Sequence, residues 1–356
     1  MSKNAILFLT PLLFFLASLL SLFPFWLGDL FSHFRIFWTV LSVVLMIVYS
    51  VFVYQKKINQ LFLVFPLATL LINWNNSPQF LYNSSSYWKQ SQTYQYLFLG
   101  SPSEVEYAEE IESDKTIKKL LLMNILSSNT NYEDVKRTIK NANADFVVII
   151  ELDKKWKTKL EEIEKQYSYQ YMKVREDNFG MGIYSKTNFI EAISLDSVHN
   201  KSKSLEANKY SMNDPNLNYY INQKKMRQPC IEVKNTNQIS IVIAHPTPPI
   251  TSKAYDRRNN YLQEVSLMVN KKPKTLLVGD LNCSPFSADY QKFLKRSGLK
   301  DSQESFGFQP TWNTSFPFLM QTPIDHVWHS DDIEILHRQT LPIKGSDHKA
   351  VLVSFR

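Results

Sequence analysis

The stretch TLLVGDLNCSPF at residues 275–286 decides how the rest of the sequence is interpreted. Its first four residues, Thr275–Val278, form a mainly apolar run that is too short for a helix, and Gly279 follows them, which predicts a buried strand ending in a turn. Asp280 and Asn282 come next at a spacing of two, so in an extended segment both side chains project to one side. An acid and an amide at the end of a core strand indicate chemistry, although the pair would equally make an Asx turn before Pro285.

Length, charge and cysteine content limit the class of protein. A chain of 356 residues accommodates a membrane region and one domain of ordinary size. Of its 40 basic and 33 acidic residues, four and one lie in residues 1–74, so the remainder has a net charge of only +4. That excess is too small to indicate a nucleic-acid groove by itself. Cys230 and Cys283 make neither a disulfide framework nor a zinc pattern, although one bridge between them stays open.

Three apolar runs predict transmembrane helices near the N-terminus. Each is close to the roughly 20 residues that a helix needs to cross a bilayer. A cleaved signal peptide is the alternative for the first run, but no small-residue cleavage site follows it. Lys56 and Lys57 favour a cytoplasmic second loop, which would place everything after residue 74 outside the cytoplasm. The predicted spans cover residues 5–27, 36–54 and 58–74 of a membrane region that extends over residues 1–74.

The rest of the chain divides into a linker and one domain. Residues 75–115 are rich in Asn, Ser, Tyr and Gln, which is typical of a juxtamembrane linker. In residues 116–356, strand-like runs such as 146–150 alternate with helix-like segments such as 255–269, which predicts a single α/β domain. Residues 191–226 are polar and poorly periodic, so we expect a long surface excursion there.

Strand-like runs in this domain repeatedly end in a residue that can bind metal or move a proton. Taken singly, each has an ordinary explanation: an acid in the first turn of a helix, a cap, or a buried histidine at the edge of the core. Six such coincidences are much harder to dismiss. The residues are Asn124, Glu151, His245, Asp280 with Asn282, Asp325, and Asp347 with His348.

These residues stand in a recognisable order. Asn124, Glu151, His245-Pro246, Gly279-Asp280-Leu281-Asn282, Ile324-Asp325-His326 and Gly345-Ser346-Asp347-His348 together resemble the endonuclease/exonuclease/phosphatase superfamily over residues 118–356. GDLN followed later by SDH is a specific signal. Many members carry other residues than Met123 before the Asn and than Leu152-Asp153 after the Glu. These differences make the subfamily harder to assign but leave the catalytic residues unchanged. The resemblance implies a four-layer α/β sandwich, two packed mixed sheets flanked by helices, behind three transmembrane helices as in a membrane-bound bacterial branch.

The resemblance also implies a catalytic role for each polar residue. Asp280 would orient and deprotonate the attacking water, and Asn282 would hold that water or a phosphoryl oxygen. His348, with its tautomer fixed by Asp325, would donate to the charge that develops on phosphorus. His245 would contact the phosphate or protonate the leaving oxygen, and which histidine is the acid stays open.

The same resemblance implies a divalent cation and its ligands. Glu151 would be the principal ligand of Mg²⁺, or alternatively of Mn²⁺, and Asp347 and Asn124 would complete the shell directly or through water. Arg227 and Asn178 are the residues that we expect to contact the substrate.

The sequence thus predicts a metal-dependent phosphoesterase that hydrolyses a phosphodiester with activated water. The substrate would be a nucleic acid or a phospholipid head group, and the lipid bilayer is the expected partner, with no protein partner predicted. The enzyme would be integral to a bacterial inner or plasma membrane, with its catalytic domain outside the cytoplasm. The alternative is a catalytically silent, membrane-anchored binding or scaffold protein that retains the fold.

Overall fold

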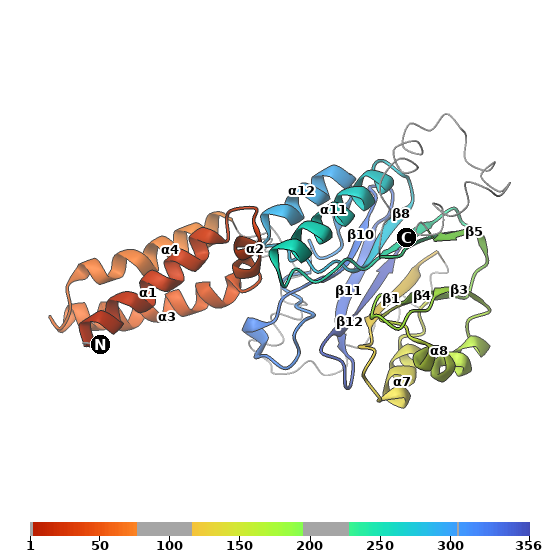
Figure 1. Cartoon of the computed structure of the whole chain (residues 1–356), viewed down its shortest axis with the longest axis horizontal. Helices are drawn as coiled ribbons and strands as arrows, with labels where there is room; N and C mark the ends of the chain where they lie inside the picture. The colour runs from red at the N-terminus through yellow and green to blue at the C-terminus, as the bar shows by residue number, and fades with distance from the viewer. Residues whose placement is uncertain (1–2, 77–115, 195–227, 305) are drawn as a thin grey trace.

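The structure, a computed structural model, describes residues 3–76, 116–194, 228–304 and 306–356. An arm of N-terminal helices projects from a layered α/β body, and the chain ends within that body (Figure 1). Most of the predicted linker and most of the predicted surface excursion lie outside the described residues.

Two six-stranded mixed sheets form the centre of the body. The first has the order β11-β12-β1-β2-β4-β3 and the second β5-β6-β7-β8-β10-β9. Each sheet contains one parallel pair, β1 with β2 and β7 with β8, among antiparallel neighbours. The strands are β1 (Lys118–Asn124), β2 (Phe146–Ile150), β3 (Tyr169–Lys173), β4 (Met181–Ser185), β5 (Phe189–Ser194), β6 (Cys230–Asn235), β7 (Ser240–Ala244), β8 (Thr275–Asp280), β9 (Lys300–Asp301), β10 (Asp325–His329), β11 (Ile335–Pro342) and β12 (Lys349–Phe355).

Helices cover the outer face of each sheet, which makes four layers (Figure 1). Successive side chains on a strand alternate between faces. Leu122 therefore packs in the core between the sheets, while Leu121 packs outward with Val135 of the covering helix. The predicted four-layer α/β sandwich is confirmed. The covering helices are α7 (Tyr132–Ala142), α8 (Lys154–Leu160) and the short η5 (Glu161–Lys165) on the first sheet, and α11 (Ser252–Val269) and α12 (Ala288–Ser297) on the second.

The arm differs in detail from the three predicted spans. Its elements are α1 (Lys3–Leu20), α2 (Trp26–Ser32), α3 (Arg35–Tyr54), η1 (Gln60–Leu63) and α4 (Val64–Asn75). The first apolar run, expected to be helical over 5–27, is interrupted after Leu20 and continues as the separate α2. Among the described residues, α3 is the one helix that is long and apolar enough to cross a membrane, whereas Leu7–Leu20 and Gln60–Asn75 are apolar but shorter. The three spans and the domain boundaries stay predictions.

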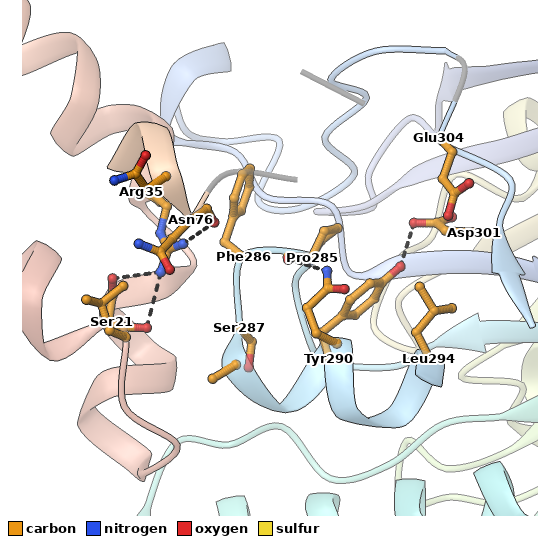
Figure 2. Close-up of a pocket in the computed structure, with 14 residues that line it drawn as sticks. Ser21, Arg35, Asn76, Pro285, Phe286, Ser287, Tyr290, Leu294, Asp301 and Glu304 are labelled. Carbon is orange, nitrogen blue, oxygen red and sulfur yellow. Dashed lines mark hydrogen bonds between the residues drawn. The ribbon is translucent and has the colours of Figure 1, made fainter. Parts of the chain in front are cut away.

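The arm is attached to the body by buried polar contacts. Asp29 of α2 forms a 2.6 Å ion pair with Arg258 of α11, and both side chains are buried. The indole nitrogen of Trp26 donates to the carbonyl of Pro249 at 2.9 Å. Beside this junction lies a cavity of about 450 Å³, lined by residues of both parts. Figure 2 shows Ser21, Arg35 and Asn76 of the arm on one side of the cavity and Pro285, Phe286 and Tyr290 of the body on the other.

Gly279 lets the ends of β7 and β8 approach each other closely. A Cβ atom at this position would lie 1.9 Å from the carbonyl oxygen of Ala244, and the backbone has a φ of +155°. No side chain larger than hydrogen fits without moving one of the two strands. The glycine of the GDLN motif therefore sets the separation of the residues that follow these strands, His245 and Asp280.

Replacement of Gly279 tests this close approach. Gly279→Ala should lower the free energy of unfolding by about 1–3 kcal/mol more than Gly298→Ala, because it adds a steric clash in a packed core. Gly298 is a matched control, since its φ is +66° but the nearest atom to an added Cβ is 3.5 Å away. Denaturant unfolding of the full chain in detergent measures both. Equal losses would contradict the explanation.

Candidate active site

The topology brings the predicted catalytic residues to one edge of the sandwich. Asn124 ends β1, and Glu151 directly follows β2, its parallel neighbour. His245 follows β7 and Asp280 ends the parallel β8, so these two also share an edge. β10 and β12 run antiparallel to β8 and β1, so the residues where they begin lie at that same edge. Those residues are Asp325, Asp347 and His348.

Asp280 lies at the centre of the group. Its Oδ2 accepts a hydrogen bond from Nδ2 of Asn124 at 3.1 Å and lies 3.7 Å from Nε2 of both His245 and His348. Its Oδ1 accepts the backbone N–H of Asn282 at 3.0 Å. Because Asn124 belongs to the first sheet and Asp280 to the second, their hydrogen bond joins the two halves of the sandwich.

Asp325 and His348 form a buried pair. Nδ1 of His348 donates to Oδ2 of Asp325 at 2.8 Å, which leaves Nε2 facing Asp280. Burial alone would lower the pKa of His348, but the Asp325 carboxylate outweighs it and raises this pKa to about 10. The structure therefore places the predicted orienting acid against its histidine.

Burial also shifts the pKa values of the other two titratable groups, Asp280 and His245, in opposite directions. Burial and the nearby Asp325 raise the pKa of Asp280 to about 8. Burial and the nearby His348 lower the pKa of His245 to about 3, so this imidazole is neutral at pH 7. The ring of Phe179 lies 5.3 Å from that of His245 and helps to exclude water from it. The two histidines thus differ in charge, which the sequence alone did not reveal.

The predicted metal ligands lie beside this centre. Oε1 of Glu151 accepts from Nδ2 of Asn124 at 3.2 Å, and Oε2 accepts the N–H of Ser127 at 3.1 Å. Oδ2 of Asp347 accepts from the indole of Trp312 at 2.9 Å, while its Oδ1 is buried and has no hydrogen-bond partner among the described residues. Asn124 directs its amide nitrogen, not its oxygen, at Glu151.

Two sets of donors could hold a cation here. Single ligand atoms of Asp280, Asp325 and His348 lie within 4.8 Å of one another. A cation in that set would compete with the 2.8 Å hydrogen bond between Asp325 and His348. Asp347 instead offers a buried carboxylate oxygen, Oδ1, that accepts no hydrogen bond among the described residues and lies 4.0 Å from Nε2 of His348. Asn124 connects this histidine to Glu151, since its Nδ2 lies 3.5 Å from Nε2 of His348 and 3.2 Å from Oε1 of Glu151. Carboxylates suit a hard divalent cation such as Mg²⁺, so the residues present fit the expected ion.

The two predicted substrate contacts have different outcomes. Asn178 is exposed, in a left-handed conformation with a φ of +63°, and its Oδ1 accepts from the hydroxyl of Ser127 at 2.7 Å. It therefore lies at the rim of the site, where Ser127 contacts both Asn178, through its hydroxyl, and Glu151, through its N–H. Arg227 lies outside the described residues.

Several supporting residues were not predicted from the sequence. Ser346 donates its hydroxyl to the carbonyl of Asn124 at 2.8 Å and so ties the SDH motif to β1. Arg258 is fully buried and donates to the carbonyl of Asn282 at 2.8 Å. The available signal was its position, because it falls on the buried stripe of α11 between Tyr255 and Leu262.

Comparison with known proteins identifies the family. A model of the endonuclease/exonuclease/phosphatase family matches residues 121–348, which is more than half of the chain. The chain therefore belongs to this family, whose enzymes hydrolyse phosphoester bonds, and the resemblance inferred from the motifs is confirmed. A search of curated proteins gives no match.

Solved structures of low sequence identity share the fold. An endonuclease/exonuclease/phosphatase from Beutenbergia cavernae is 15% identical with a TM-score of 0.50, covering 67% of this chain and 71% of that one. D. rerio TDP2 complexed with single-strand DNA product is 15% identical with a TM-score of 0.52, covering 68% and 100%. The 3′ phosphatase NExo from Neisseria, bound to a product DNA hairpin, is 16% identical with a TM-score of 0.51, covering 67% and 99%.

The charge of His348 can be tested directly. In metal-free protein its pKa should lie near 10, and Asp325→Asn should lower it by about 1–3 pH units, because the favourable negative charge is removed. NMR titration of histidine-labelled full chain measures this value, with Glu334→Gln at a surface ion pair as the control. An unchanged pKa in Asp325→Asn would show that Asp325 does not hold the charge.

Proposed function

We propose that this chain is a metal-dependent phosphoesterase that hydrolyses a phosphodiester by direct attack of an activated water. The observation that carries the proposal is the placement of Asp280, a buried carboxylate 3.7 Å from two histidines and hydrogen-bonded to Asn124. A phosphodiester is anionic and resists a nucleophile, so its hydrolysis needs a base for water and positive charge for the phosphoryl oxygens.

Asp280 is the proposed base. Asp280 accepts a proton only when it is ionised, which its raised pKa of about 8 favours at alkaline pH, and in that form it is a stronger proton acceptor than a carboxylate in water. Asn282 stands beside it with its amide nitrogen fixed on the carbonyl of Pro246 at 3.0 Å. Asp280 would take the proton of the attacking water, and Asn282 would hold that water or a phosphoryl oxygen.

The two histidines would then serve different purposes. His348, paired with Asp325, is the cationic group and would stabilise the negative charge that develops on phosphorus. His245 is neutral at pH 7, so it would contact the phosphate as a hydrogen-bond donor rather than as a charge. We therefore propose that His348, rather than His245, donates the proton to the leaving oxygen.

Glu151 and Asp347 would hold the cation, with Asn124 contributing directly or through water. When bound, Mg²⁺ or Mn²⁺ supplies a Lewis acid that neutralises phosphoryl oxygens. The buried Oδ1 of Asp347, which accepts no hydrogen bond among the described residues, supports this assignment. Asn178, at the rim beside Ser127, would contact the rest of the substrate, as would Arg227.

Two substrate classes remain candidates. The D. rerio and Neisseria structures hold DNA products, which supports a nucleic acid. The apolar α3 supports a bilayer location, and with it a phospholipid head group as the substrate. We propose an integral membrane protein whose catalytic body lies outside the cytoplasm. A catalytically silent scaffold is the alternative, but the acid, amide and histidine set at one edge gives it little support.

Hydrolysis of bis(p-nitrophenyl) phosphate by the full chain in detergent tests the reaction. Turnover should require Mg²⁺ or Mn²⁺ and stop with EDTA. Asp280→Ala and His348→Ala should each lower kcat by about 10²–10⁴-fold, the usual effect of losing a general acid or base. Glu334→Ala, at an exposed ion pair, is the control. Metal-independent turnover, or full activity in Asp280→Ala, would contradict the proposal.

Glu151→Ala tests the metal ligand separately. Calorimetric titration of the full chain with Mg²⁺ should lose its binding signal in this variant and keep it in Glu334→Ala.

The dependence of the rate on salt concentration distinguishes the two substrate classes. DNA cleavage should weaken steeply between low and physiological salt, because phosphate contacts release counterions. Cleavage of a lipid head group should depend instead on its presentation in a bilayer.

A further inference from the structure

Arg258 connects the helical arm to the active-site loop. It lies on α11 and is fully buried, and one guanidinium nitrogen, Nη1, makes two contacts. Nη1 donates to Oδ2 of Asp29 at 2.6 Å and to the backbone carbonyl of Asn282 at 2.8 Å. The remaining nitrogens, Nε and Nη2, donate to Oδ1 of Asn259 at 3.0 and 2.8 Å. Every nitrogen of its guanidinium group therefore donates a hydrogen bond inside the protein.

Asp29 reaches the same loop by a second route. Its Oδ1 accepts from the hydroxyl of Ser287 at 2.6 Å, where Ser287 is the N-cap of α12. Asp29 is 3% exposed, so both of its oxygens are used inside the protein. One residue of α2 thus contacts both ends of the segment between β8 and α12, directly at Ser287 and through Arg258 at Asn282. In Figure 1, α2 lies against the ends of α11 and α12.

We propose that Asp29 and Arg258 are positioning residues, through which the N-terminal arm fixes the geometry of the GDLN loop. The inference rests on the proposed function, because it assigns these two residues to the same site. Neither residue is placed against the substrate. Their effect is transmitted by the backbone of Asn282.

The loop needs such a support because Asn282 has an unfavourable backbone conformation. Its φ is +49°, a left-handed conformation that Asn tolerates better than other non-glycine residues but that is still less favourable than ordinary backbone. The N–H of the same residue donates to Oδ1 of Asp280 at 3.0 Å. A shift of its carbonyl would therefore also move a hydrogen bond of the proposed base.

The charge balance explains why Asp29 matters for Arg258. Without Asp29, the next carboxylate is Asp289, whose Oδ2 lies 4.0 Å from Nη2 of Arg258 and whose Oδ1 already accepts from Lys292 at 3.0 Å. A buried guanidinium that loses its main counter-ion is strongly destabilised in place. It would turn toward Asp289 or water, and the bond to Asn282 would be lost.

Steady-state kinetics of the full chain in detergent test the proposal. Asp29→Asn and Arg258→Lys should each lower kcat by about 10–100-fold with little change in KM, the range found when a group that orients a functional side chain is lost. Trp26→Phe is the matched control, since it removes a separate hydrogen bond between α2 and the body, to the carbonyl of Pro249, without contact to Asn282. This variant should keep kcat within about twofold, because its contact is peripheral.

A double variant separates positioning from a general loss of structure. In the Asn282→Ala background, Asp29→Asn should lower kcat by a smaller factor than in the wild type, because one of the two groups that the loop backbone positions, the side chain of Asn282, is already absent. Multiplied losses would overturn the proposal and leave Asp29 as a structural residue. Thermal unfolding of each variant identifies any that fail to fold.

Hydrogen exchange gives a readout that does not need activity. Amides in residues 281–287 should exchange at least about tenfold faster in Asp29→Asn than in the wild type or in Trp26→Phe, because local opening becomes easier. Unchanged exchange in this segment would overturn the positioning role, even if the wild type hydrolysed no phosphodiester. Conversely, faster exchange without any wild-type turnover would support the link and contradict only the proposed function.

Discussion

The site depends on keeping one carboxylate, Asp280, buried at the seam between two sheets. Burial of an ionisable group is costly unless hydrogen bonds and opposite charge offset it. Asn124 supplies a hydrogen bond from the first sheet, Asn282 supplies a backbone N–H, and His348 supplies positive charge. These partners come from opposite halves of the chain, so the site exists only when both sheets are packed together. Packing of the core between the two sheets is therefore a condition for assembling the active site.

A second buried charge extends this dependence beyond the sandwich. Arg258 satisfies the carbonyl of Asn282, but it is itself stable in the interior only because Asp29 reaches it from α2. The arm is therefore more than a set of apolar helices beside the body. A catalytic body separated from its arm would retain a buried guanidinium without its main counter-ion, and the loop that carries Asn282 would lose a support.

The sequence predicts the parts of this structure that local patterns specify. β2 is apolar throughout because both of its faces are covered, so residues 146–150 were correctly predicted as a strand. β11 was not predicted, because it contains the polar His337, Arg338 and Gln339, and Arg338 is buried through long-range hydrogen bonds to Ser302 and Gln309. The burial of Arg258 agrees with its place on the buried stripe of α11, but no local pattern reveals its partner Asp29, which lies 229 residues away.

The central claim is that Asp280 activates a water that attacks phosphorus directly, without a covalent enzyme intermediate. The stereochemical course of the reaction tests this claim most directly. Hydrolysis of a chiral phosphorothioate diester in ¹⁸O-water by the full, metal-loaded chain should incorporate one solvent oxygen and invert the configuration at phosphorus, as a single in-line displacement requires. Retention of configuration would indicate two displacements through a phosphorylated side chain and would contradict the account.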